Sequence, residues 1–427
     1  MKQALFFILW LAIVAPTQGQ TAATSSDEPL TWKAGAASVV ITPQENLWMA
    51  GYAARKKPAE GKAQDLFAKA LALEDEAGQR LVIVTMDFIR VPRSLRDKVS
   101  ARMLADRKLP PERLLMNASH THCGPDLNAP KGFEEKTQRY AKTLEDSLVR
   151  VIGEALDRLS PASVSYSHGR CGFAMNRRWP SEGKYQNHPN SDGPVDHDVP
   201  VLSVRDADGK LRAVAFGYAC HNTTLISTTL PPEPPRYLYN GDYAGFAQQA
   251  FQQAYPEAVA LFVMGCGGDQ NPYPRNGEMP GKLPLEMAAH HGQTLANSAV
   301  AAMLAGSRPI RGKILATTGE VVLDRNEGKP SHSYLIQAIR LGDSLTLVAL
   351  GSETVIDYSL RLKREIKSPI VWIAGYSNEM IGYIPSRRVA IEGGYEAQMN
   401  FKLDVEQRIV GKVHALLSEL DQSSASK

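Results

Sequence analysis

The sequence predicts an α/β protein in which mixed β-sheets are flanked by helices. Two observations lead to this fold class. Runs of β-branched and other apolar residues alternate with segments of helical periodicity over residues 34–420, and interleaved strands and helices are typical of sheets covered by helices. No linker rich in Pro, Ser or Gly divides this stretch. We therefore expect a single domain over residues 34–420.

The predicted strands are short apolar runs, most of them rich in β-branched residues. They are Lys69–Glu74, Leu81–Met86, Arg113–Asn117, Ser163–Tyr166, Val199–Arg205, Leu211–Tyr218, Ala258–Met264, Ile314–Val322, Leu345–Leu350 and Ile370–Ile373. The sequence Asp206-Ala207-Asp208-Gly209 between two of them predicts a hairpin turn. Apolar residues at helical spacing predict the helices Arg93–Asp106, Glu134–Leu159, Tyr243–Ala254, Leu285–Ala305, Thr354–Ile366 and Val405–Leu420.

Three polar stretches interrupt this pattern, and we expect long loops at Arg177–Asp198, Ser227–Asn240 and Asn271–Leu285. The second contains four prolines, which exclude regular secondary structure there. Loops of this length in a compact domain are often functional. The alternative is that they are surface insertions without a role in the site.

The composition of the 427 residues excludes several classes of protein. Hydrophobic residues make up 43%, enough to form a sizeable core, which excludes a disordered chain. Lys and Arg total 48 against 45 Asp and Glu, a net charge of +3, so we expect no nucleic-acid partner. Four cysteines are too few for a disulfide scaffold. The oligomeric state and any disulfide stay open.

The N-terminus resembles a signal peptide over residues 1–19. Lys2 precedes the 12-residue apolar run Ala4–Ala15, and Thr17-Gln18-Gly19 offers small residues for cleavage. The run is shorter than the roughly 20 residues of a membrane span, although a membrane-anchoring helix is the alternative. We expect a polar leader over residues 20–33, a tail over 421–427 and no transmembrane span. The sequence thus predicts a secreted or periplasmic protein.

The most informative local motif is Ser119–Pro125 (SHTHCGP), which follows an apolar run. In extended backbone, residues two apart face the same side, so His120 and His122 are expected to point into one pocket. Neutral histidine is a common zinc ligand. An HxH pair also occurs by chance in many proteins.

Ligand-type residues recur after other predicted strands, where open α/β sheets place their sites. They are His221, Asp269, Glu353, Asn378 and Tyr383. For Glu353 the alternative is a helix cap, because acidic residues suit a helix N-terminus. For the glycine run before Asp269 the alternative is a turn.

These motifs together resemble the neutral/alkaline (non-lysosomal) ceramidase family, in its N-terminal catalytic domain. The matching residues occur in the family's order along the chain. They are Ala34-Gly35, Ile41-Thr42-Pro43, Met49–Tyr52, Ala70–Asp75, Ser119–Pro125, Met175-Asn176-Arg177, His221, Asn240-Gly241-Asp242, Gly268-Asp269, Gly351–Thr354, Asn378–Tyr383 and Tyr395-Glu396. The resemblance implies a single ceramidase-like catalytic domain, and we expect it without the family's additional C-terminal β-domain.

The resemblance implies a zinc site and a surrounding set of catalytic residues. The family's two histidine, one glutamate and one tyrosine ligands correspond to His120, His221, Glu353 and Tyr383. A zinc-activated water would then attack an amide carbonyl. The other catalytic candidates are His122 beside the reacting carbonyl, the pocket residues Arg177 and Tyr395, and Asp269 of the Gly-Asp motif.

Two departures from the family pattern bear on the substrate. Gly265 stands where the family has a serine. Cys123, which follows His122, stands where the family has a second serine. We expect a small-molecule or lipid N-acyl substrate. The alternatives are a different acyl substrate, such as a glycan-linked amide or ester, or a non-catalytic secreted binding protein. Cys123, Cys220 and Cys266 have two possible interpretations. Each is either a thiolate nucleophile or a small buried residue close to the site.

Overall fold

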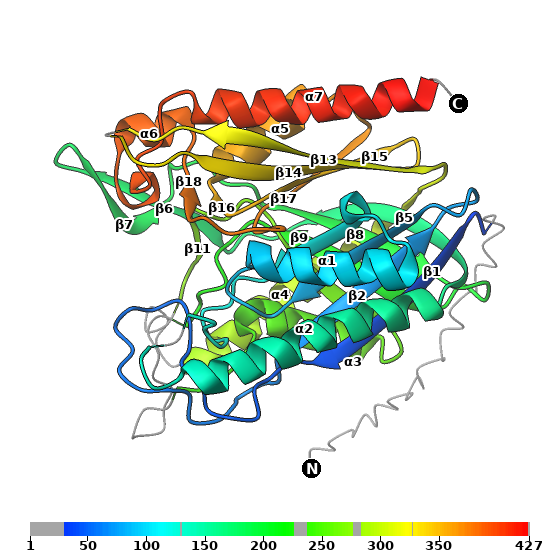
Figure 1. Ribbon diagram of the computed structural model, residues 1–427, viewed down its shortest axis with the longest axis horizontal. Coiled ribbons are helices and arrows are strands. Elements are labelled where there is room, and N and C mark those ends of the chain that lie inside the picture. Colours follow the sequence, from blue (N-terminus) through cyan, green and yellow to red (C-terminus); the bar gives the residue numbers. More distant parts are fainter. Residues whose placement is uncertain (1–29, 129, 226–236, 276–282, 327, 426–427) are drawn as a thin grey trace, which may run out of the picture.

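The computed structural model describes residues 30–128, 130–225, 237–275, 283–326 and 328–425 (Figure 1). Its largest sheet has nine strands in the order β10-β9-β8-β5-β1-β2-β3-β4, with β12 paired to β5. These strands are β1 (Trp32–Val40), β2 (Phe67–Glu74), β3 (Arg80–Met86), β4 (Leu114–Ala118), β5 (Ser160–Arg170), β8 (Asp198–Arg205), β9 (Leu211–Tyr218), β10 (Val259–Met264) and β12 (Arg308–Pro309). The pairs β3–β4 and β9–β10 are parallel and the others antiparallel, so the sheet is mixed.

A second sheet has four strands in the order β13-β14-β15-β17. They are β13 (Ile314–Leu323), β14 (His332–Leu341), β15 (Leu345–Leu350) and β17 (Ile370–Ala374). A three-stranded sheet contains β6 (Ala174–Ser181), β7 (Lys184–Asn190) and β11 (Gln270–Pro272). The short strands β16 (Glu353–Thr354) and β18 (Tyr383–Ile384) pair in parallel.

The two large sheets pack face to face between two layers of helices. Leu71 and Ile83 of the nine-stranded sheet share one buried apolar cluster with Leu347 and Trp372 of the four-stranded sheet. Figure 1 shows α7 over β13 and β14 on one side of the molecule and α2 on the other. The helices are α1 (Arg93–Arg107), α2 (Glu134–Asp157), α3 (Asp242–Ala254), α4 (Pro284–Ala305), α5 (Ile356–Glu365), α6 (Arg387–Glu392) and α7 (Val405–Ala425).

This architecture confirms the predicted α/β fold with mixed sheets, and the turn at Asp206–Gly209 joins β8 to β9. The expected loop at Arg177–Asp198 is wrong, because β6 and β7 form a hairpin within it. Strands β1 and β14 were not predicted. β1 begins at Trp32 and α7 ends at Ala425, each beyond the predicted boundaries of the domain.

Parts of the predicted chain organisation lie outside the described residues. The predicted signal peptide falls there, as do residues 226–236 and 276–282 of the other two expected loops. Among the described residues, no helix is both long and apolar enough to cross a membrane. All four cysteines are buried and free.

Candidate metal centre and catalytic pocket

His120 and His122 lie in the turn that follows β4. The backbone of His120 is left-handed, with φ at 60°, so the expected extended geometry is wrong at this position. The two rings nevertheless converge, because their Nε2 atoms are 3.1 Å apart. The amide of His120 donates to the carbonyl of Phe88 at 2.9 Å, which holds the turn against the loop that follows β3.

Two backbone carbonyls orient His120 and His221. The Nδ1 atom of His120 donates to the carbonyl of Ile89 at 2.6 Å, and that of His221 donates to Gly267 at 2.6 Å. A carbonyl can only accept, so each Nδ1 carries the proton of the neutral ring and each Nε2 keeps its lone pair. This arrangement is typical of metal-binding histidines.

Glu353 brings a carboxylate to the same point. Its Oε2 atom lies 3.3 Å from Nε2 of His120 and 3.2 Å from Nε2 of His221. The hydroxyl of Tyr383 lies 3.4 Å from Nε2 of His221. Glu353 and Tyr383 are opposite one another in the parallel pair β16–β18, and this pairing explains how two distant segments reach one site.

The four side chains fit a zinc ion. Imidazole nitrogen and carboxylate oxygen are zinc ligands, and Oε2 of Glu353 is buried without a hydrogen-bond partner among the described residues. Burial raises the pKa of Glu353, but His120 and His221 outweigh burial and hold that pKa well below its usual range. Burial, assisted by Arg177, lowers the pKa of His221 to about 4. Both groups therefore favour the unprotonated form that a metal requires.

His122 belongs to the same histidine cluster. The candidate ligand atoms of His120, His122 and His221 all lie within 4.8 Å of one another. A three-histidine donor set and the set with Glu353 and Tyr383 share His120 and His221. We favour the second set, because Glu353 contacts both shared imidazoles and has no other partner for Oε2.

A loop that precedes β2 holds His122 in place. The Nη2 atom of Arg55 donates to the carbonyl of His122 at 2.6 Å, and the Tyr52 ring lies 4.8 Å from the His122 ring between centroids. Burial, with His120 and His221 adding to it, lowers the pKa of His122 well below its usual value. Arg55 belongs to no motif that would mark it in the sequence, and Tyr52 was expected only as part of a family motif.

Arg177 lies against the rings of both Tyr383 and Tyr395, with its guanidinium carbon 5.5 Å from each ring centroid. Its Nε atom donates to Glu396 at 2.8 Å, and Nη1 lies 3.4 Å from Nε2 of His221. Its Nη2 atom is buried and has no hydrogen-bond partner among the described residues. Tyr395 is half-exposed at the mouth of the site. The structure thus places Arg177 behind the tyrosines.

Asp269 lies beneath the site and links its segments. Its Oδ1 atom accepts from the amide of Ile356 at 2.8 Å, and its Oδ2 atom accepts from the side chain of Asn176 at 3.1 Å. Burial, with Asp357 adding to it, raises the pKa of Asp269 to about 6. Asp269 is not among the residues that line the catalytic cavity. This placement indicates a positioning role rather than contact with the substrate.

The catalytic cavity has a volume of about 330 Å³. The candidate site residues that line it are His120, His122, Glu353, Tyr383 and Tyr395. Trp48 and the ion pair between Arg90 and Asp126, at 3.0 Å, also line it. These three residues come from loops without a recognisable motif, so they could not be predicted from the sequence.

The cysteines are poor nucleophiles in this environment. Burial raises the pKa of Cys123 to about 11 and that of Cys266 to about 12. A thiol must lose its proton to act as a nucleophile, and neither residue lines the catalytic cavity. The structure therefore favours the interpretation of both as small buried residues.

The fold and the site together define an α/β protein with a histidine–carboxylate centre at the carboxyl ends of its strands. Residues 32–272 match the family of neutral/alkaline non-lysosomal ceramidases, in its N-terminal region. The chain belongs to this family, which makes it a ceramidase-like hydrolase of amide bonds and confirms the resemblance noted from the sequence. Glu353, Tyr383 and Tyr395 lie beyond the matched segment.

Two solved structures have the same fold. The neutral ceramidase from Pseudomonas aeruginosa gives a TM-score of 0.76 at 20% identity, covering 92% of this chain and 75% of its own. A ceramidase described as complexed with C2 gives 0.76 at 19% identity, covering 92% of this chain and 76% of its own. No curated protein matches the chain.

Proposed function

We propose that this protein is an exported, zinc-dependent hydrolase that cleaves the amide bond of an N-acyl substrate. The observation that carries the proposal is that Oε2 of Glu353 lies 3.3 Å from Nε2 of His120 and 3.2 Å from Nε2 of His221. Both imidazoles are oriented by backbone carbonyls. Zinc, when bound, supplies an acidified water and polarises the scissile carbonyl. Tyr383 would be the fourth protein ligand.

The protein's own side chains then have separate tasks. His122 lines the cavity beside the ligand cluster, where it would stabilise the developing oxyanion or move a proton to the leaving amine. Arg177 would hold Tyr383 and Tyr395 through its contacts with both rings. Asp269 would position Asn176 and the start of helix α5. Hydrolysis by this route needs neither a serine at position 265 nor a thiolate.

Metal analysis of the purified protein tests the first half of the proposal. We expect close to one zinc per chain by plasma mass spectrometry. The double variant His120→Ala, His221→Ala should lose it, because half of the ligand set is removed. A matched control is His168→Ala, a largely exposed histidine outside the cluster. Less than about 0.2 zinc per chain, with no binding on add-back, would contradict a zinc centre.

The substrate is tested by comparing turnover of labelled ceramide with that of N-acylated amino sugars. A lipid N-acyl substrate follows from the family. The second candidate, a more polar acyl substrate, is favoured by Trp48, Arg90 and Asp126 around a cavity of about 330 Å³. Faster turnover of the sugars would establish the second candidate. Zinc binding without hydrolysis of any amide or ester would instead indicate a secreted binding protein.

Export is proposed from residues 1–19 alone. Fractionation followed by mass spectrometry of the N-terminal peptide tests it. We expect mature protein outside the cytoplasm, with its N-terminus near residue 20. Full-length protein retained in a membrane fraction would favour the anchoring alternative.

A further inference from the structure

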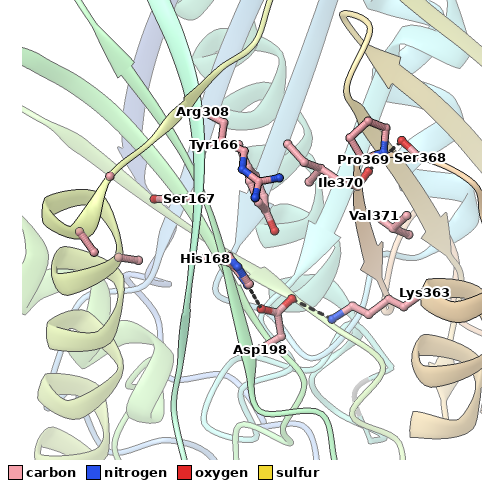
Figure 2. Close-up of a pocket in the computed structure, with 13 residues that line it drawn as sticks. Tyr166, Ser167, His168, Asp198, Arg308, Lys363, Ser368, Pro369, Ile370 and Val371 are labelled. Carbon is pink, nitrogen blue, oxygen red and sulfur yellow. Dashed lines mark hydrogen bonds and ion pairs between the residues drawn. The ribbon is translucent and has the colours of Figure 1, made fainter.

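Two places outside the proposed ligand set contain buried polar side chains, and they differ in how these are paired. Figure 2 shows a cavity of about 460 Å³ that shares no lining residue with the catalytic cavity. There Asp198 bonds His168 at 3.1 Å and Lys363 at 2.9 Å, so these three side chains satisfy one another. Beside the metal centre, by contrast, the hydroxyl of Tyr376 has no hydrogen-bond partner among the described residues.

The backbone of Tyr376, in the turn that follows β17, joins the segments that carry His120 and Glu353. Its carbonyl accepts from the amide of Ala118 at 3.2 Å, and its amide donates to the carbonyl of Ser352 at 3.0 Å. Ala118 ends β4 two residues before His120, and Ser352 directly precedes Glu353. The φ of Tyr376 is +48°, a left-handed conformation that is uncommon for a bulky residue and persists only where the surroundings hold it. The fold thus fixes this side chain beside the metal centre.

The ring of Tyr376 lies against both histidines of the proposed ligand set. Its centroid is 4.5 Å from that of the His120 ring and 6.1 Å from that of the His221 ring. Tyr376 is 0% exposed. Burying a hydroxyl without a hydrogen bond costs free energy, so we expect an acceptor for it within the centre.

Glu353 offers the matching acceptor. Its Oε2 atom is also buried without a hydrogen-bond partner among the described residues. Burial, with Glu353 and then Tyr383 adding to it, raises the pKa of Tyr376 well above its usual value. The hydroxyl therefore keeps its proton and is able to donate. Carboxylates that bind a metal are commonly hydrogen-bonded as well, which orients them toward the ion.

We propose that Tyr376 is a positioning residue of the zinc centre and that its hydroxyl donates a hydrogen bond to the carboxylate of Glu353 when zinc is bound. This role rests on the proposed function. The bond orients Glu353 toward His120 and His221 and so increases the affinity for zinc. Tyr376 is not among the residues that line the catalytic cavity, which fits a place behind the ligand rather than contact with the substrate.

The variant Tyr376→Phe tests the proposal, because it keeps the ring and removes only the hydroxyl. Competition with a chelator measures the zinc dissociation constant of the purified full chain. We expect this constant to rise by about 10- to 100-fold, the usual effect of removing a hydrogen-bond partner of a metal ligand. In the metal-free state, Tyr376→Phe should resist urea at least as well as the wild type, because a buried hydroxyl without a partner has been removed.

The control Tyr140→Phe should show the opposite pattern. The hydroxyl of Tyr140 donates to the carbonyl of Ile41 at 2.7 Å, and neither residue lines the catalytic cavity. Its loss leaves a buried carbonyl without this donor. Tyr140→Phe should therefore lower the resistance to urea and leave the zinc dissociation constant unchanged. If Tyr376→Phe behaves like this control, Tyr376 has only a structural role and the proposal is overturned.

A crystal structure of the zinc-loaded protein would show the bond directly. We expect the hydroxyl of Tyr376 within about 3.0 Å of a carboxylate oxygen of Glu353, and a hydroxyl bonded elsewhere would overturn the proposal. So would equal zinc affinity in the wild type and Tyr376→Phe while His120→Ala loses zinc, a result that leaves the proposed function intact. A wild type that binds no zinc would instead contradict the zinc centre itself, and with it this role of Tyr376.

Discussion

Gly51 lies directly against the imidazole ring of His122. Its φ is +99°, and a Cβ atom at this position would lie 2.5 Å from Cγ of the histidine. A side chain at residue 51 would therefore have to displace the ring or the loop. The backbone of one residue thus limits where the candidate catalytic imidazole can stand, and Arg55 holds the carbonyl of His122 from the same loop.

We expect Gly51→Ala to lower kcat by about a hundredfold, because a displacement of about 1 Å in a catalytic group has an effect of this size. Zinc content should be unchanged, since the contacts of Gly51 are with His122 rather than with the proposed ligands. The control Gly78→Ala imposes a similar backbone cost at φ +75° with no atom within 4 Å. Steady-state kinetics measure kcat in both variants. An equal fall in kcat in both would indicate a general loss of folding instead.

Substitution of the two motif histidines separates a ligand from a catalytic residue. His122→Ala should keep nearly full zinc occupancy while kcat falls by roughly 10²–10³, the usual loss for an oxyanion donor or general acid. KM should change little if the interaction forms mainly in the transition state. His120→Ala should lose the metal together with the activity. Equal loss of zinc from both variants would make His122 a ligand and favour the three-histidine set.

The fold could be predicted where buried strands carry continuous apolar runs. The residues Leu81–Met86 are all buried in β3, and the sequence alone indicated them. Strand β1 has Lys33, Gly35 and several alanines, which have low strand propensity, so it was missed. The hairpin of β6 and β7 is mostly polar, and polar strands give no core-facing pattern to detect.

The candidate site could be predicted for those residues that directly follow apolar strands, because the ends of these strands converge in the fold. His221 and Glu353 could be identified because each follows an apolar strand, and the structure brings them together. The contact of Gly51 with His122 and the ion pair of Arg90 with Asp126 depend on the path of loops. Loop paths are set by tertiary contacts, which periodicity and propensity do not encode.

The buried carboxylate of Asp269 gives a pH dependence of stability with a defined sign. Burial raises its folded-state pKa to about 6 from a reference value of 3.8. The unfolded chain therefore releases this proton first, so the contribution of Asp269 to stability is greatest below pH 4 and falls as the pH rises to 6. We expect the stability advantage of the wild type over Asp269→Asn to shrink by roughly 3 kcal/mol between pH 4 and pH 8.

Urea unfolding of both proteins at several pH values measures this difference. The loss of the bond from Asn176 in Asp269→Asn does not depend on pH, so it cancels when two pH values are compared. Asp208→Asn, in the exposed β8–β9 turn, is the control. A wild-type advantage that grows with pH would show that hydrogen bonds to the carboxylate outweigh its burial.

Glu396 joins two buried arginines, and its removal should destabilise the protein strongly. One carboxylate oxygen accepts from Arg177 at 2.8 Å and the other accepts from Arg178 at 2.5 Å. Removing one partner of a buried ion pair leaves charge uncompensated and costs about 3–5 kcal/mol. We expect Glu396→Gln to lower the free energy of unfolding by about this amount. We also expect KM to rise, because Arg177 contacts the ring of Tyr395 at the cavity mouth.

The control is Glu392→Gln, which removes a more exposed partner of Arg178 but leaves the contact between Arg177 and Glu396 intact. It should have a smaller effect on unfolding and leave KM unchanged. Urea denaturation and steady-state kinetics on both variants measure the two effects separately. Equal loss of stability in both would mean that the network stabilises the protein mainly through Arg178, and an unchanged KM in Glu396→Gln would remove Arg177 from the positioning of Tyr395.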